Sequence, residues 1–474
     1  MTERPDGRAV RVRGAGGALQ DPLTGPDRGF LPLVAVCLGA AVGPLDTAVN
    51  IAFPAIAEAL GLPVAAIQWV IICYVLTYAC LLLGFGRLGD VVGHRRVFVA
   101  GLIWSAAALA ACALAPTLPW LLAARALQGI GTALVLSCGP ALATLAYPES
   151  RRGQIVGLYM LGFAAGSAAG PLLGGLLVAA GGWPAVFWFR IPIALLALVL
   201  VLRTTTAERA LDQGERLDVN GAAALALVLA CLLLLVNRLA QSGPLAPLPI
   251  ALATIGAAAS AWLALRRTRG GQPVIEARRF RDPAFAAANA AHVLGQLASF
   301  TVFLLVPFYL VQARQLPVGT AGMVLALSPL ATMAASAVAG RALGRWSPPT
   351  VGALGLFLVA GGLAIVATTP IDLGWPAVAA ALAVQGAGHG LFQVAVADAV
   401  IAAMPRESRG VAGSLSMVTR TVGVVCAASI GAALVAQDGG GFPLDGFRAT
   451  LGLATGAAVA AGALLAVTRR PQST

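Results

Sequence analysis

The chain has 474 residues, of which 59% are hydrophobic and 11% charged, and its formal net charge is +12. A soluble domain carries about 25% charged residues, so this composition excludes an ordinary soluble protein. All 31 basic residues are Arg, and without Lys there can be neither a P-loop nucleotide site nor a Schiff-base lysine. The seven Cys and three His lack metal-ligand spacing, and no nucleophile–base pair is evident, so we expect no cofactor and no enzyme activity.

Apolar stretches of the length that crosses a bilayer, about 20 residues, occur fourteen times. In chain order they cover approximately residues 31–55, 66–88, 97–115, 119–146, 154–180, 184–202, 217–239, 247–266, 285–312, 319–344, 350–369, 376–402, 408–436 and 447–467. The sequence therefore predicts an all-α integral membrane protein with 14 transmembrane helices. Residues 1–29 are polar, and we expect a disordered tail rather than a signal peptide.

The Arg residues lie mainly on one side of the predicted helices. The loops and tails of that side carry 25, the opposite loops carry 3, and 3 lie within helices, namely Arg125, Arg190 and Arg420. Because cytoplasmic loops are enriched in positive charge, both termini are predicted to be cytoplasmic. The net charge is thus a topology signal, and with no aromatic-basic face we expect no nucleic-acid partner. Arg in place of Lys, with abundant Ala and Gly, indicates a GC-rich bacterial genome and hence a bacterial inner (plasma) membrane.

An internal repeat relates the two ends of the chain at an offset of 257 residues. Gln128–Leu134 matches Gln385–Leu391, and Pro148–Gly153 matches Pro405–Gly410. Both copies have the same orientation, so the duplication is parallel. We predict an N-terminal six-helix bundle, a two-helix insert, a C-terminal six-helix bundle and two cytoplasmic tails, at residues 30–203, 204–269, 270–468, 1–29 and 469–474.

The loop after the second predicted helix carries a pattern of Gly, acidic and basic residues. It includes Gly86, Asp90, Gly93, Arg95 and Arg96. With this spacing the sequence resembles the major facilitator superfamily, whose members have two parallel six-helix halves. We expect Asp90 to face a helix N-terminus or an Arg across a cytoplasmic gate. The corresponding segment of the second half, Gly340–Arg345, lacks the acid.

Further motifs resemble those of the fourteen-spanner drug:proton antiporters. They are Leu45–Pro54 in the first helix, Arg125–Gly129 in the fourth and Gly166–Gly175 in the fifth, and Leu217–Gly221 resembles the start of an inserted helix. In the fifth helix the antiporter motif comprises Gly162, Gly166, Gly170, Pro171 and Gly174. Spacing of four places these glycines on one face, where helices can approach closely, and Pro171 invites a bend. The alternative is a static packing seam.

One position departs from that family, because Arg190 stands where its members usually have Asn before a Pro. At about 1.5 Å per residue, Asp46 lies about 22 Å from the cytoplasmic end of its helix and Arg125 about 9 Å from the outer end of its own. Arg190 falls at the level of Arg125, so these three charges are predicted to share one layer.

An ionisable residue within the membrane by default marks function or a pair. We expect proton coupling to involve Asp46, Arg125 and Asp398. A nonpolar environment favours a protonated carboxyl group and a nearby Arg favours the ionised form, so a change of environment could load and release a proton at Asp46. The alternative for Asp46 is a permanent structural pair with Arg125, and for Asp398 it is a helix-end position in cytoplasmic water.

The predicted substrate cavity combines polar residues of both halves: Asn50, Gln128, Arg190, His292, Gln296, His389 and Arg420. A packing role is the alternative for His292 and Gln296, and a satisfied core position for His389. Together with the resemblance, these residues favour a proton-coupled exporter of drugs, antibiotics or other amphipathic small molecules that works by alternating access as a monomer. The alternative is an importer of an organic anion, and the three Arg within helices favour neutral or anionic substrates over dications.

Overall fold

The computed structural model describes residues 30–468 except 146, 148–150, 206–218, 243–245, 268–279, 344, 372, 403–408 and 436–441. The described residues are helical with short connections and contain no strand. Both predicted tails, the Leu217–Asp218 part of the insert motif and most of the repeated polar loops lie outside the described residues.

The first half begins with a broken helical rod that consists of α1, η1 and α2. Pro44 follows α1 and starts a short 3-10 turn, which ends at Asp46 before the helix resumes. The helices of this half are α1 (Leu31–Ala41), η1 (Pro44–Asp46), α2 (Thr47–Ala59), η2 (Val64–Ile67), α3 (Gln68–Val92), α4 (His94–Ala113), α5 (Leu118–Leu145), α6 (Arg152–Gly181), α7 (Ala185–Trp188) and α8 (Arg190–Thr204).

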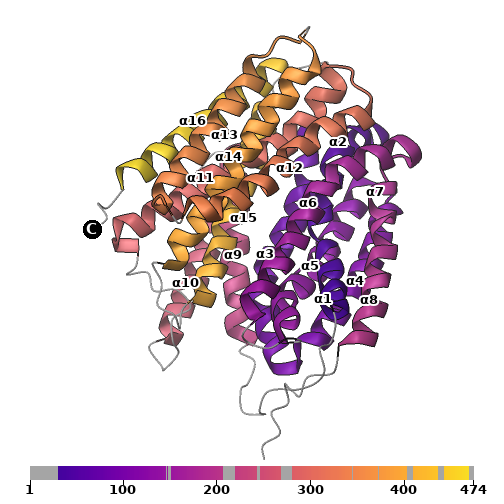
Figure 1. Cartoon of the computed structure of the whole chain (residues 1–474), viewed down its shortest axis with the longest axis vertical. Coiled ribbons are helices and arrows are strands. Elements are labelled where there is room, and N and C mark those ends of the chain that lie inside the picture. The colour runs from indigo at the N-terminus through magenta and orange to yellow at the C-terminus, as the bar shows by residue number, and fades with distance from the viewer. Residues whose placement is uncertain are drawn as a thin grey trace, which may run out of the picture.

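Two helices connect the halves, α9 (Val219–Ser242) and α10 (Pro247–Arg267), and they pack on each other. The second half contains α11 (Pro283–Phe308) with a π turn η5 (Tyr309–Ala313), α12 (Val318–Ala342), α13 (Pro348–Thr368), α14 (Trp375–Ala402), α15 (Arg409–Val435) and α16 (Leu444–Val467). Figure 1 shows the first half in indigo and purple beside the second half in orange and yellow.

Among the described residues, 11 helices are long and apolar enough to cross a membrane. The two parts of α3 are bent by 47° relative to each other, and counting them as one span raises the number to 12. The apolar parts of α9 and α10 are shorter, at Ala226–Leu239 and Pro247–Leu263. Both inserted helices occur where the sequence predicts them, but fourteen spans remain a prediction.

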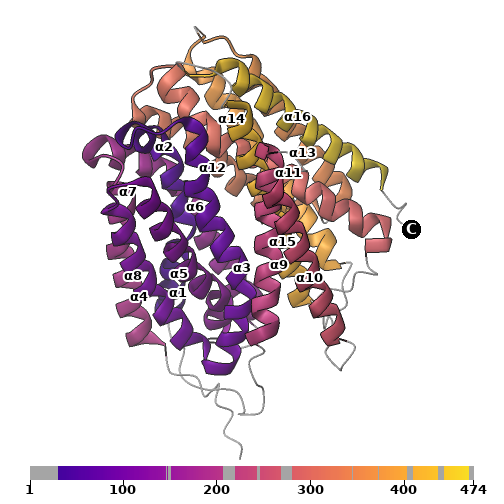
Figure 2. The same ribbon diagram turned by 180° about the vertical axis from the view of Figure 1, so that it is seen from behind.

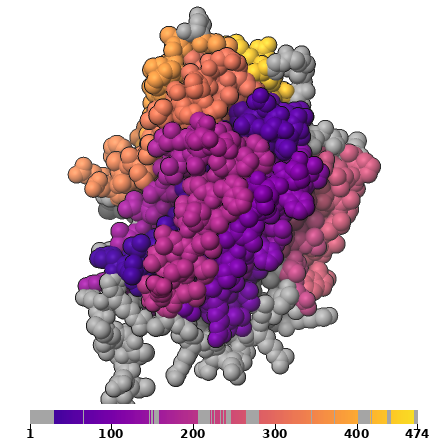
Figure 3. Space-filling view, turned by 90° about the vertical axis from the view of Figure 1, so that its right-hand side faces the viewer, coloured from indigo at the N-terminus to yellow at the C-terminus, as the bar shows by residue number. Residues whose placement is uncertain are grey.

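The most extensive contacts between the halves among the described residues join α6 with α12, α3 with α15 and α2 with α11. The inserted helix α9 packs against α3 of the first half and α15 of the second, as Figure 2 shows. Figure 3 gives the side view in which the first half covers most of the front and the second half rises above it.

The apolar core is continuous between the halves at only one end of the described structure. At the end where α2 finishes, one cluster includes Phe53 and Ile67 of the first half and Leu305 of the second. At the end where α1 begins and α16 finishes, each half has a separate cluster, one containing Phe98 and the other Leu465. The halves are therefore sealed together at the α2 end, which is uppermost in Figure 1.

A buried amide joins the two halves at the sealed end. Asn237 of α9 is fully buried, and its Nδ2 donates to Gln68 Oε1 at 3.1 Å and to Ser429 Oγ at 2.8 Å. Gln68 belongs to the first half and Ser429 to the second. The inserted helix thus bridges the halves by hydrogen bonds from the Asn237 amide nitrogen, while Asn237 Oδ1 has no hydrogen-bond partner among the described residues.

The contact between α6 and α12 depends on glycine. A Cβ at Gly322 would lie 2.7 Å from the carbonyl oxygen of Pro171 and 2.8 Å from the Cα of Gly175. Real Cβ atoms do not approach backbone so closely, so the two helices could not keep this spacing with any larger residue. Gly319, one turn earlier on α12, has no atom within 4 Å of the corresponding position.

We expect Gly322→Ala to push α6 and α12 apart and weaken the sealed end, at a cost of about 1–3 kcal/mol for overpacking. Amide hydrogen exchange in nanodiscs should become faster in α6 and α12 near the substitution. The matched control is Gly319→Ala, which should exchange like the wild type. Equal exchange in the two variants would contradict the inferred backbone contact.

Candidate functional site

The break in the first rod places an acid in the interior of the first half. Asp46 is the last residue of η1, directly before α2, and its side chain is 13% exposed. Thr47 fixes the break, since its hydroxyl shares its one hydrogen between the Pro44 carbonyl oxygen at 3.0 Å and the Ser167 carbonyl oxygen of α6 at 2.9 Å. The Asp46 carboxylate therefore has a defined position between α3, α5 and α8.

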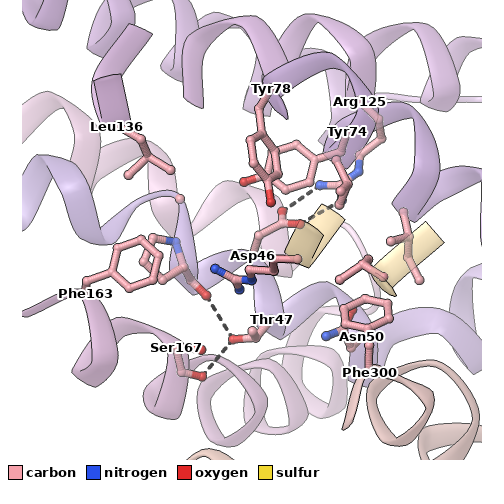
Figure 4. Close-up of a pocket in the computed structure, with 16 residues that line it drawn as sticks. Asp46, Thr47, Asn50, Tyr74, Tyr78, Arg125, Leu136, Phe163, Ser167 and Phe300 are labelled. Carbon is pink, nitrogen blue, oxygen red and sulfur yellow. Dashed lines mark hydrogen bonds and ion pairs between the residues drawn. The ribbon is translucent and has the colours of Figure 1, made fainter. Parts of the chain in front are cut away.

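Asp46 binds two arginines at once. Arg125 Nη1 and Nη2 donate to Oδ1 and Oδ2 at 2.6 and 2.7 Å, and Arg190 Nη1 donates to Oδ1 at 2.8 Å. Gln128 Nε2 donates to Oδ1 at 3.0 Å. The predicted layer of three charges is therefore a direct ion cluster, and Figure 4 shows Asp46 and Arg125 within it.

Both guanidinium groups make further contacts besides those with Asp46. Arg125 is 1% exposed, donates through Nε to the Val70 carbonyl at 2.9 Å and lies 4.4 Å from the ring centre of Tyr74. Arg190 is fully buried and donates through Nε to the Val186 carbonyl at 3.1 Å, but its Nη2 has no hydrogen-bond partner among the described residues. One carboxylate thus faces two cations, and the cluster has a net positive charge.

A cavity of about 110 Å³ adjoins this cluster and is lined by both halves. Among its walls are Asp46, Asn50 and Arg125 of the first half and Arg420 of the second. Aromatic side chains that the sequence analysis did not identify also line it: Tyr74, Tyr78, Phe163 and Phe300. The i, i+4 spacing of Tyr74 and Tyr78 on one helix was the available sequence signal.

The other predicted cavity residues do not line this cavity. Gln128 is buried within the ion cluster, and Arg190 binds Asp46 without being among the residues that line the cavity. His292 pairs with Thr419, with 2.8 Å between Nδ1 and Oγ1, and its Nε2 lies 3.4 Å from Gln296 Nε2. His292 and Gln296 therefore have the contacts that the packing alternative predicts.

His389 and Asp398 lie on α14, away from the cavity walls. The His389 ring lies 6.1 Å from the ring of Phe392, and its buried Nδ1 has no hydrogen-bond partner among the described residues. The alternative for His389 was a buried histidine with all its hydrogen bonds made, and the unpartnered Nδ1 does not fit that alternative. Asp398 is exposed, which leaves Asp46 as the acid beside the cavity.

The predicted gating loop forms the junction of α3 and α4. Gly93 ends α3 with φ +103°, a conformation that favours glycine. Asp90 lies 3.7 Å from Arg87 Nη1 and 3.4 Å from His94 Nε2, so these partners come from its own loop rather than across a gate. Gly86 is half-buried in α3, with only Ser137 Cβ 4.0 Å from a built Cβ.

The two arginines of this loop bind helix ends. Arg95 donates to Thr205 Oγ1 at 3.0 Å and to the Leu202 carbonyl at 3.1 Å, at the end of α8, and Arg96 donates to the Val92 carbonyl at 3.4 Å. Such cations satisfy carbonyl groups at a helix C-terminus. The loop therefore connects α3, α4 and α8 within the first half.

One face of α6 carries a glycine ladder, as the spacing of four predicts, made up of Gly162, Gly166, Gly170 and Gly174. This face packs on α1 and α2, which form the first rod. A Cβ at Gly162 or Gly166 would lie 3.3 Å from Cys37 or Ala41, and one at Gly174 would lie 2.7 Å from the Ala48 carbonyl oxygen. Gly170 contacts Thr47 directly, next to Asp46. Pro171 is within α6 and its carbonyl faces Gly322, so this helix also forms the sealed contact.

Comparison with known proteins gives consistent results. The family model of the Major Facilitator Superfamily matches residues 35–369 and 288–474. The chain is 30% identical to "Uncharacterized transporter YebQ" of Escherichia coli (strain K12), over 88% of this chain and 90% of that protein. It is 31% identical to "Tetracenomycin C resistance and export protein" of Streptomyces glaucescens, over 84% of this chain and 76% of that protein.

Among solved structures, the fold is similar to that of a bacterial homolog of the human lysosomal transporter Spinster in an inward-facing and unoccupied conformation. The TM-score is 0.66 at 15% identity, over 95% of this chain and 100% of that one. At this identity the likeness concerns the fold alone.

We expect Asp46→Asn to lower the stability of the protein by about 3–5 kcal/mol, because two buried guanidinium groups lose their carboxylate. The thermal unfolding midpoint in detergent should fall accordingly. The double variant Asp46→Asn with Arg190→Asn should recover part of the loss, since one of the unpaired charges is then absent. An unchanged midpoint for Asp46→Asn would show that the ion cluster does not stabilise this half.

Proposed function

The chain belongs to the major facilitator superfamily, and we propose that it is a proton-coupled exporter of drugs, antibiotics or other amphipathic small molecules that works by alternating access. The observation that carries this proposal is the Asp46–Arg125–Arg190 cluster beside a cavity that both halves line. A similar protein has "resistance and export" in its name, which agrees with the antiporter-like glycine ladder.

Asp46 is the proposed proton site. In this conformation three side chains donate to its carboxylate, so it is held ionised. Proton uptake then requires a second conformation in which the guanidinium groups have moved away from the carboxylate. Since α6 contacts Thr47 beside Asp46 and also α12 of the other half, movement between the halves can change the surroundings of this acid.

The arrangement of the cores supports alternating access. With both termini cytoplasmic, as the Arg distribution predicts, the sealed α2 end faces outward and the separate cores face the cytoplasm. The described conformation would then take substrate from the cytoplasmic side. The cavity of about 110 Å³ is smaller than the roughly 300–1,000 Å³ that is usual for a drug site. The halves would therefore have to rearrange to admit a drug-sized molecule.

The driving force is sufficient for export. One charge that crosses a potential of 100 mV gains about 2.3 kcal/mol, which sustains a roughly fifty-fold substrate gradient. The ion cluster and the cavity belong to one chain, so we propose that the protein functions as a monomer. We also propose that it lies in the bacterial plasma membrane with 14 spans and needs no cofactor. Proton-coupled or facilitative import of an organic anion is the second candidate, which the cavity residue Arg420 favours.

Transport in inside-out vesicles distinguishes export from import. We expect an interior-acid pH gradient to drive accumulation of toxic compounds inside such vesicles, as an exporter requires. Loss of preloaded compound from the vesicles under the same gradient would support the importer and contradict the proposal. Vesicles without the protein provide the baseline for passive partition.

Asp46→Asn is expected to abolish pH-driven accumulation, with at least a tenfold loss of rate, because the proposed proton site can no longer titrate. Asp445→Asn, an exposed position at the start of α16, is the matched control and should transport normally. Asp398→Asn tests the second acid directly. Full proton-driven transport by Asp46→Asn, with loss in Asp398→Asn, would move the proton site to Asp398.

A further inference from the structure

Arg420 of the second half faces the cavity, and none of the described residues supplies a counter-charge to it. Arg420 lies on α15, is half-buried and lines the cavity. Among the residues that the structure describes, none forms a hydrogen bond or ion pair with its guanidinium group. A cation within a membrane protein is costly unless it is paired or used in function, so this side chain requires an explanation.

Asp46, the acid on the cavity wall, is already occupied. Arg125 binds both of its oxygens, and Oδ1 also accepts from Arg190 and Gln128. Arg420 therefore cannot gain the same carboxylate unless the existing cluster breaks. Arg420 lies near enough to His292 and His389 to interact with them electrostatically, and neither of these side chains is an acid.

The charges around the cavity consequently have a positive sum. Arg125 and Arg420 line it, Arg190 binds Asp46, and Asp46 is the only acid among the described residues that line it. Tyr78, Phe163 and Phe300 add aromatic surface to the walls. A positive centre beside aromatic rings suits a ligand that combines an anionic group with an apolar ring system.

We propose that Arg420 binds the acidic group of the substrate, and that the substrates are aromatic or apolar molecules that carry one carboxylate or a similar anionic group. This inference rests on the proposed transport function and names its substrate class. Arg420 completes its hydrogen bonds on the ligand, while the aromatic walls contact the apolar body. A guanidinium group offers two parallel N–H donors to a carboxylate, which gives geometry as well as charge.

Three probes of similar shape test the charge preference. They are naphthalene-1-acetate, its uncharged methyl ester, and a naphthylmethyl trimethylammonium cation. Their binding to purified full-length protein is measured in nanodiscs of zwitterionic lipid, with empty nanodiscs as the baseline for partition. We expect the wild-type protein to bind the carboxylate at least about tenfold more tightly than the ester or the cation.

Variants of one position connect this preference with Arg420. Arg420→Gln should weaken carboxylate binding about tenfold or more and leave ester binding within about twofold, whereas Arg420→Lys should retain binding within about threefold. Arg448→Gln removes an exposed arginine of α16 and serves as the matched control with unchanged binding. Equal loss for carboxylate and ester in Arg420→Gln would indicate a structural role and overturn the proposal.

The assay separates this inference from the proposed export function. Arg420-dependent carboxylate binding without pH-driven accumulation in inside-out vesicles would overturn export and leave the anion site intact. Accumulation of uncharged or cationic compounds, with no preference for the carboxylate in binding, would overturn the anion site and leave export intact. Failure of the wild-type protein to bind the carboxylate also overturns the inference.

Discussion

The interior of the first half depends on one carboxylate that binds two cations. Asp46 joins the break of the first rod to α5 through Arg125 and to α8 through Arg190. Arg125 extends the connection to α3 through the Val70 carbonyl. Buried charges of this kind are tolerated only when their hydrogen bonds are well satisfied, so the position of each of these helices is constrained by the others.

The glycine ladder of α6 allows this helix to approach the ion cluster closely. Because Gly170 and Gly174 have no side chains, α6 lies directly against Thr47 and Ala48, at the start of α2. The Thr47 hydroxyl binds the Ser167 carbonyl at the same contact. On its other side α6 touches Gly322 of the second half through Pro171. A shift between the halves is therefore transmitted through α6 to the residue next to Asp46.

The sequence allowed the charge layer to be predicted, because counting residues along a helix gives depth and depth alone brought Asp46, Arg125 and Arg190 to one level. It did not predict helix rotation, which depends on packing between distant segments. His292 and Gln296 were therefore placed in the cavity although they bind each other and α15. For the same reason the sequence left two partners open for Asp90, a helix N-terminus or an Arg across a gate, and Asn237 was not identified as the bridge between Gln68 and Ser429.

The halves differ in how their charges are used, although the repeat makes them related in sequence. In the first half the arginines are tied to Asp46 and to backbone carbonyls, so their charges serve the interior of the protein. In the second half Arg420 reaches the same cavity, and Asp46, the acid among the described residues of its wall, is already bound by Arg125, Arg190 and Gln128. A proton that neutralised Asp46 would leave three uncompensated cations around the cavity, and a bound anion would then be held more tightly. In this conformation protonation of Asp46 and anion binding would therefore favour each other, as in proton–anion symport, so antiport requires that the rearrangement between the halves separates Arg420 from the anion when Asp46 is protonated.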